Sequence, residues 1–370
     1  MTEYKHKVLL LPTTDFTAKS FYETYRLVLD KVDFTIILEG PNIQSEESYP
    51  DFITLKMKSY RVKRNLAGLR FFFPILLRVE VSRILRKHEY NSIIVSNECG
   101  LHQSIFVKKA QKRGIRCISH QVSSGIVNND VLKKKLSLAK RIILNLYGSR
   151  QCKGYGYYSD EVWLMGEAWR NILQRDTFDI MPNGYYQNLV SSFRANSSAF
   201  TRWDKSQRNI VFFGGPLSEI ELTTREQHLH ILQSLESFAL TNKELENTKF
   251  FYKPHPQEAL VWSDQKIFQF VNIVDCSPEE ALFNTDIGLS VSSSMSLQSR
   301  LLGKRSIGFH PYGLSEAITG GSKHFFDKIF KDIKELTADD LLHCSTNNSK
   351  ELNDVVNMNI DLRSKLLLKL

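Results

Sequence analysis

Cysteine, glycine and proline are scarce in this sequence, and long hydrophobic runs are lacking. The 370 residues hold five cysteines without a Cys-x-x-Cys pair, which excludes zinc ribbons and thioredoxin-like chemistry and suits a reducing cytoplasm. With 18 glycines and 10 prolines the chain is neither collagen-like nor a low-complexity polymer. No stretch reaches the roughly 18 apolar residues of a transmembrane helix, and no secretion signal is recognisable. We therefore expect a cytoplasmic globular protein of about two domains.

Acidic residues are outnumbered, since 49 Lys and Arg face 40 Asp and Glu, a formal net charge of +9. Such an excess favours an anionic partner: nucleic acid, an anionic membrane surface or a phosphorylated small molecule. Two segments concentrate the charge. Segment 61–90 carries eight basic and two acidic residues interleaved with aromatic and aliphatic runs, and segment 133–150 carries six basic residues and no acidic one. Each predicts either a helix in an anionic membrane interface or a solvated helix face packed on its apolar side.

Short apolar segments alternate with helical segments along both halves of the chain. The predicted strands are 7–11, 34–38, 92–95, 116–119 and 161–165, then 209–213, 248–252, 270–274, 287–291 and 305–309. This alternation predicts βαβ units and an α/β fold of two Rossmann-like domains that face each other across a cleft. The polar stretch 196–207 is the expected linker, giving an N-terminal domain over 1–195, a C-terminal domain over 208–349 and a C-terminal helix over 350–370.

Three segments at predicted strand ends carry chemistry. His255 lies between two prolines after strand 248–252, where its imidazole can donate to a phosphate or a leaving group, or form a structural bond in a turn. A serine cluster (Ser292, Ser293 and Ser294) joins strand 287–291 to a helix, so hydroxyls and backbone N–H groups converge on a helix N-terminus, although one serine is needed as the cap. The pair Gly214-Gly215 after strand 209–213 permits close approach of a ligand or of neighbouring backbone.

The order of these motifs resembles the C-terminal domain of bacterial GT-B glycosyltransferases of surface-polysaccharide synthesis. That group includes sialyl- and polysialyltransferases, Kdo transferases and, more remotely, CDP-glycerol glycerophosphotransferases. Its His-Pro and Ser-Ser motifs match His255-Pro256 and the serine cluster, and the resemblance is best over about 205–310. It implies metal-independent, inverting transfer of an acidic sugar, sialic-acid-like or Kdo-like, from a CMP-activated donor to a glycan or lipid-linked acceptor. The resemblance implies that His255 is catalytic, stabilising the departing CMP, and that Ser293 and Ser294 bind its phosphate. Ser292 and the glycine pair are further candidates for the phosphate site, and no further cofactor is expected.

The resemblance also implies a catalytic base in the first domain, within a short acidic motif ending in glycine. Glu98, in Ser96–Gly100, is the best match, although it is a single acid flanked by Asn97 and Cys99; capping of the next helix is its alternative role. Asp15, after the first strand, is a second candidate base or a helix cap. His120 stands where the glycerophosphotransferases carry a catalytic histidine.

Other functions stay open at this point. Transfer of an alditol phosphate from a CDP-alditol is the close rival, and His120 would then matter more than Glu98. A sugar-nucleotide epimerase of the same fold is a further alternative, against which the basic segments argue. A nucleic-acid-binding protein is an alternative that the basic first domain allows, but no recognised module is visible and no nucleic-acid partner is expected. A non-catalytic scaffold that binds nucleic acid or a membrane is a further alternative, because the acidic motif is incomplete. The expected partners are the donor, the acceptor and, for the basic segments, anionic inner-membrane lipids.

Overall fold

The computed structural model describes most of the chain, in two compact units. The described ranges are 5–38, 43, 49–59, 73–98, 100–122, 155–195, 203–204, 206–220, 222–243, 245, 247–258, 261, 267–291, 293–314, 324–342 and 349–370. The first unit comprises the described residues up to 122, those of 155–188 and those of 353–370, and the second comprises those of 189–352. Ser292 and the basic segment 133–150 lie outside the described residues, as do residues 61–72 of the other basic segment.

The first unit is built on a seven-stranded parallel sheet with the order β3-β2-β1-β4-β5-β6-β7. Its strands are β1 (His6–Leu11), β2 (Val32–Ile37), β3 (Ile53–Leu55), β4 (Ser92–Val95), β5 (Arg116–His120), β6 (Glu161–Leu164) and β7 (Asp179–Ile180). The central strands are continuous apolar runs because helices cover both faces of the sheet. Successive side chains of β1 alternate between these faces.

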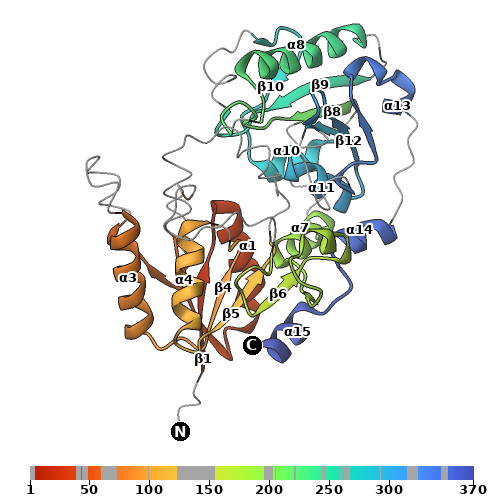
Figure 1. Cartoon of the computed structure of the whole chain (residues 1–370). Helices are drawn as coiled ribbons and strands as arrows, with labels where there is room; N and C mark the ends of the chain where they lie inside the picture. Colours follow the sequence, from red (N-terminus) through yellow and green to blue (C-terminus); the bar gives the residue numbers. More distant parts are fainter. Residues whose placement is uncertain are drawn as a thin grey trace. The chain divides into compact units, whose positions relative to one another are not determined.

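Each face of this sheet has its own helices (Figure 1). Val8 and Leu10 of β1 belong to one core, with side chains of α1 (Asp15–Tyr25) and α15 (Leu362–Lys369). Leu9 and Leu11 belong to the other, with side chains of α3 (Phe73–Lys87) and α4 (Leu101–Gln111). The remaining helices are the 3₁₀ helices η1 (Arg26–Val28) and η3 (Glu167–Ile172), with α7 (Gly184–Ala195) and α14 (Ser349–Val355), which both run across the unit boundary.

The second unit repeats the plan with a six-stranded parallel sheet of order β10-β9-β8-β11-β12-β13. Its elements are β8 (Arg208–Phe213), α8 (Arg225–Thr241), β9 (Thr248–Lys253), β10 (Asn272–Ile273), α10 (Pro278–Asn284), β11 (Ile287–Ser290), α11 (Ser294–Leu301), β12 (Arg305–Phe309), β13 (Lys328–Phe330), η6 (Ile333–Glu335) and α13 (Ala338–Leu342). In both sheets the strand order reverses beside the first strand, between β1 and β4 and between β8 and β11. Ligands of doubly wound sheets bind at the carboxyl ends of the strands that flank this reversal.

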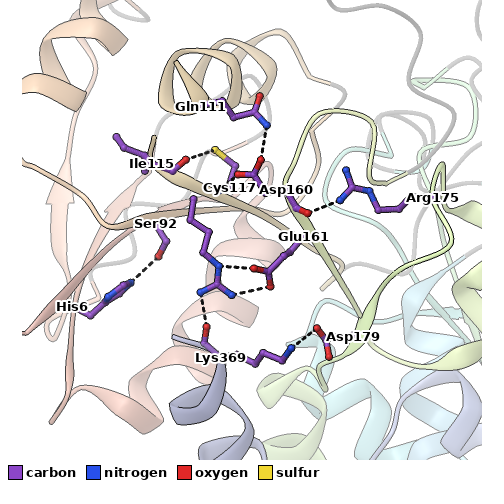
Figure 2. A network of polar contacts seen from close by, with 11 residues as sticks. His6, Ser92, Gln111, Ile115, Cys117, Asp160, Glu161, Arg175, Asp179 and Lys369 are labelled. Carbon is purple, nitrogen blue, oxygen red and sulfur yellow. Dashed lines mark hydrogen bonds and ion pairs between the residues drawn. The ribbon is translucent and has the colours of Figure 1, made fainter. Parts of the chain in front are cut away.

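The C-terminal segment differs from the single helix expected over 350–370. It forms α14 and α15, because Asp361 begins a new helix by accepting the Ser364 N–H, and Asn357 donates its N–H to the Met165 carbonyl. Figure 2 shows how the last helix is held. Arg116 donates to both oxygens of Glu161 (2.6 and 2.8 Å) and to the Lys369 carbonyl (2.6 Å), while the Lys369 ammonium reaches Asp179 (2.6 Å). Residues 353–370 are thus part of the first unit.

Candidate functional site

His255 stands at the carboxyl end of β9, in the turn that follows Lys253. Its ring Nδ1 accepts the backbone N–H of Gln257 (3.1 Å), so a neutral imidazole carries its proton on Nε2, which becomes the donor atom of the ring. Burial lowers the pKa of His255, the Glu258 carboxylate opposes this effect, and the Lys253 ammonium adds to the lowering. The neutral His255 ring can donate its Nε2–H to an anionic oxygen. A bound anion would in turn favour the protonated form of the ring.

A buried carboxylate holds this turn in place. Glu258 is fully buried; its Oε1 accepts from the Tyr252 hydroxyl (2.5 Å) and His228 Nε2 (3.1 Å), and its Oε2 accepts the His255 N–H (3.0 Å). The Glu258 N–H in turn donates to the His255 carbonyl (2.9 Å). Burial, with the neighbouring Glu258 charge, raises the pKa of the Tyr252 phenol well above its usual value, so this group stays a donor. Hydrogen bonds to both sides of His255 therefore fix its backbone.

Gly214 is required by the same carboxylate. A Cβ added at Gly214 would lie 2.2 Å from Glu258 Oε2 and 2.7 Å from the Tyr252 hydroxyl oxygen, so no larger residue fits without displacing the network. At Gly215 the nearest atom to an added Cβ would be Leu217 Cδ2, at 3.7 Å. The two glycines thus differ. The space beside Gly214 is filled by the Glu258 and Tyr252 side chains, whereas Gly215 has room beside it for an approaching group. A cavity of about 20 Å³ lies beneath these strand ends.

The serines after β11 divide into buried and half-buried members. Ser290 and Ser296 are buried and share a hydrogen bond (2.7 Å), and Ser290 Oγ also accepts the Ser293 N–H (3.2 Å). Ser293 is the N-cap of α11, its Oγ accepting the Met295 N–H (3.3 Å), which confirms the capping role expected for one serine. Ser294 is the first helical residue, where a backbone N–H has no acceptor within the helix.

Register brings these three strand ends to one edge of the sheet. Phe213, the last residue of β8, pairs with Lys253 of β9 on one side and with Ser290 of β11 on the other. The glycine pair, the His255 turn and the start of α11 therefore begin side by side, at the reversal of strand order. An imidazole donor, backbone N–H groups and a helix N-terminus converge there, and this combination suits a phosphate.

Sequence reasoning missed three residues of this edge. Lys253 is buried at the last position of β9, with its Nζ 3.5 Å from the Pro254 carbonyl, and it places a positive charge beside His255. Glu258 and His228 form the supporting network described above. Lys253 and Glu258 lie within three residues of His255, so their closeness to the His-Pro motif is a signal that the sequence carries. His228, on α8, lies 30 residues before Glu258 along the chain, and no local pattern marks it.

Glu98 has a structural task in the first unit. Its carboxylate is fully buried and accepts three backbone N–H groups, from Tyr157 (2.6 Å), Tyr158 (2.9 Å) and Ser159 (2.8 Å). The expected alternative, a helix cap, is wrong, because Gly100 is the N-cap of α4. Proton transfer to Glu98 would require part of this arrangement to break, and its role as a base stays a prediction.

His120 lies in the core of the first unit. It is fully buried beside aromatic rings; its Nδ1 contacts the Tyr25 hydroxyl (2.7 Å) and its Nε2 the Met181 carbonyl (3.2 Å). A carbonyl only accepts, so Nε2 carries the proton and Nδ1 accepts from Tyr25. Burial lowers the pKa of His120 to about 4. The ring is therefore neutral, with a hydrogen-bond partner on each nitrogen, and its role as a base stays a prediction.

Asp15 is the first residue of α1, and the cap is its neighbour. Thr14 and Thr17 form a reciprocal capping box, so the interpretation of Asp15 as the N-cap is wrong by one residue. Asp15 is half-buried at the positive end of the helix dipole, just after the carboxyl end of β1. Its role as a base stays a prediction.

Comparisons with known proteins place the fold. Neither the models of known families nor the curated protein sequences give a match. Solved structures match over nearly the whole chain. The UDP-GlcNAc 2-epimerase of Methanocaldococcus jannaschii, in complex with UDP-GlcNAc and UDP, has a TM-score of 0.62 at 11% identity over 98% of this chain and 99% of that one. The UDP-GlcNAc 2-epimerase of Neisseria meningitidis bound to UDP-GlcNAc gives 0.57 at 12%, covering 98% of both chains. The glycotransferase of kitacinnamycin gives 0.60 at 10%, covering 99% of both.

At these identities the likeness concerns the fold. Each unit is an α/β domain with a parallel sheet in Rossmann-like order, and the solved structures match both units together. The fold predicted from the sequence is thereby confirmed: the chain has the GT-B fold, with two Rossmann-like domains.

Proposed function

We propose that the protein is a nucleotide-sugar-dependent glycosyltransferase whose second unit binds the donor through its phosphate. The observation that carries this proposal is the register at the carboxyl edge of β9, β8 and β11, which brings the His255 turn, Gly215 and the N-terminus of α11 together. Proteins of the same fold whose structures hold UDP-GlcNAc, and a glycotransferase, support a nucleotide-sugar ligand.

The donor proposed is a CMP-activated acidic sugar, on the strength of the His-Pro and serine motifs. In the transfer, an acceptor hydroxyl attacks the anomeric carbon, and the bond between that carbon and the phosphate oxygen breaks with its electron pair going to CMP. His255 Nε2–H and the first N–H groups of α11 donate to the phosphate as this charge develops, and such fixed donors act chiefly in the transition state. The acceptor proton passes to a base in the first unit, for which Asp15 and Glu98 are the candidates. The acceptor is a surface glycan or its lipid-linked precursor.

A second candidate is a UDP-sugar epimerase, favoured by the fold of the two UDP-GlcNAc 2-epimerases. It uses the same phosphate edge but a uridine nucleotide. Transfer of an alditol phosphate would depend more on His120 than on Glu98, and His120 is buried in the core.

Nucleotide-dependent thermal stability separates these functions. The wild-type protein is heated with CMP, CDP, UDP or GDP, next to His255→Ala and the control His230→Ala, which removes an exposed histidine of α8 in the same unit. A ligand at a hundredfold excess over its Kd stabilises the folded state by about 2.7 kcal/mol. We expect a shift with CMP that survives in His230→Ala and disappears in His255→Ala. A shift with UDP alone selects the epimerase, and no shift with any nucleotide contradicts a nucleotide site.

A further inference from the structure

Helix α3 leaves aliphatic side chains uncovered on its outer surface. Its inner side chains, among them Leu77 and Val81, are fully buried against the first sheet. Ile75 and Val79, one helical turn apart, are 48% and 55% exposed, and Leu76 beside them is 37% exposed. A helix that packs well on one side and exposes three neighbouring aliphatic residues on the other presents a surface for a partner.

Basic side chains lie on the same helix and on its neighbour. Helices α3 and α4 lie side by side on the sheet (Figure 1). Together with the residues just after α4 they carry eight basic side chains: Arg78, Arg83, Arg86, Lys87, Lys108, Lys109, Lys112 and Arg113. Two of the three carboxylates in 73–113 are engaged by the protein itself. Glu80 accepts the N–H groups of Lys58 (2.6 Å) and Ser59 (2.8 Å), and Glu98 is buried. Glu89 is the third, and is exposed.

An open groove lies between the two helices. Its volume is about 590 Å³, and it is lined by Arg78, Ile105, Lys108, Lys109, Gln111 and Lys112. The Lys108 ammonium also lies over the Tyr158 ring, 4.4 Å from its centre, which fixes one wall. Four basic residues around one open groove match the charge of phosphate headgroups.

We propose that this α3–α4 face, defined by Ile75, Leu76, Val79 and the groove residues, docks on an anionic lipid bilayer. Lipid is favoured over a soluble polyanion because the exposed aliphatic residues adjoin the basic ones: a bilayer interface takes up both, whereas a polyanion uses only the charge. Among the described residues no helix is long and apolar enough to cross a membrane. This surface belongs to the first unit and does not depend on the proposed donor chemistry in the second.

Vesicle binding tests the proposal with two variants and a matched control. The full-length protein is sedimented with vesicles of phosphatidylcholine alone or mixed with phosphatidylglycerol. The charge variant is Lys109→Gln with Lys112→Gln, and its control is Lys331→Gln with Lys334→Gln, two exposed lysines of the second unit. Each basic residue near an anionic surface contributes about 1 kcal/mol, roughly fivefold in partitioning, so the charge variant should bind about 25-fold more weakly. The control should bind like the wild type.

The aliphatic side chains are tested separately with Ile75→Ser and Val79→Ser. Salt screens the charges but not apolar insertion, so this double variant should lose the binding that the wild type retains at high salt. Wild-type protein without preference for anionic vesicles overturns the proposal. The proposal is also overturned if the serine variant binds vesicles as the wild type does and the wild type binds a soluble anionic polysaccharide tightly. That result would assign the groove to a polyanion. Because the nucleotide response of the same proteins is measured independently, failure here is distinguishable from failure of the donor site.

Discussion

The replacement Glu258→Gln probes the support of the proposed phosphate site. The carboxylate accepts three hydrogen bonds, from Tyr252, His228 and the His255 backbone, at a fully buried position. An amide of the same shape has one oxygen and one NH₂ group, so at least one of the three donors then faces another donor. A hydrogen bond to a charged group contributes about 1.5–3 kcal/mol, and a buried donor without a partner costs about 1–3 kcal/mol. We therefore expect a loss of roughly 3 kcal/mol or more in the stability of the second unit.

The same change should weaken nucleotide binding in a pH-dependent way. Since the Glu258 charge raises the pKa of His255, its removal lowers that pKa further, and binding that depends on the protonated ring shifts to lower pH. Urea unfolding with hydrogen exchange, read on peptides from β8, β9 and α8, reports the second unit by itself. The control is Glu219→Gln, a more exposed carboxylate 3.9 Å from His228, for which less than about 1 kcal/mol is expected. Equal stability losses for the two variants would refute the reasoning.

Three further predictions concern stability. Burial lowers the pKa of His120 to about 4, so as the pH falls this histidine takes up a proton in the unfolded chain before it does so in the folded protein. The free energy of unfolding should therefore drop by up to about 3 kcal/mol between pH 6.5 and 4. His120→Gln should flatten this part of the pH profile while keeping nucleotide binding. The Lys304 ammonium donates to the carbonyls of Leu282, Phe283 and Thr285, so Lys304→Met should cost about 2 kcal/mol in urea unfolding, against no measurable loss for the exposed Lys331→Met. Gly214→Ala should lower the melting temperature through its clash with Glu258, whereas Gly215→Ala should leave it unchanged and affect only nucleotide affinity; the reverse order would contradict the assignment of space at these glycines.

The sequence was sufficient for the elements that carry local signals. Strands β4 and β12 begin and end where their apolar runs predict, and Ser277 caps α10 as its Ser-Pro-Glu-Glu pattern indicates. The short strands β3, β7 and β13 were not predicted, because two or three residues at a sheet edge leave no periodic pattern. The sequence of 17–30 alone indicates one continuous helix, whereas α1 ends at Tyr25 and a 3₁₀ turn follows.

In the candidate site, too, the residues with local signals could be predicted and those with distant partners could not. The sequence could place His255, the serines and the glycine pair at one edge, because each follows a predicted strand and parallel strands bring their carboxyl ends together. The environments of Glu98 and His120 were not predictable, since their partners lie far along the chain: Tyr157 is 59 residues from Glu98, and Tyr25 is 95 residues from His120. Whether a polar side chain serves chemistry or the interior depends on such distant contacts, which local sequence patterns do not contain.

The protonation of the His255 ring tests the central claim most directly. NMR of the ring during a pH titration gives its pKa with and without CMP. Without ligand, burial should hold the pKa below the usual value of a histidine. If the CMP phosphate accepts from Nε2, the pKa must rise on binding, because the anion favours the charged ring. A His255 pKa that does not change when CMP saturates the protein would contradict the proposed phosphate site.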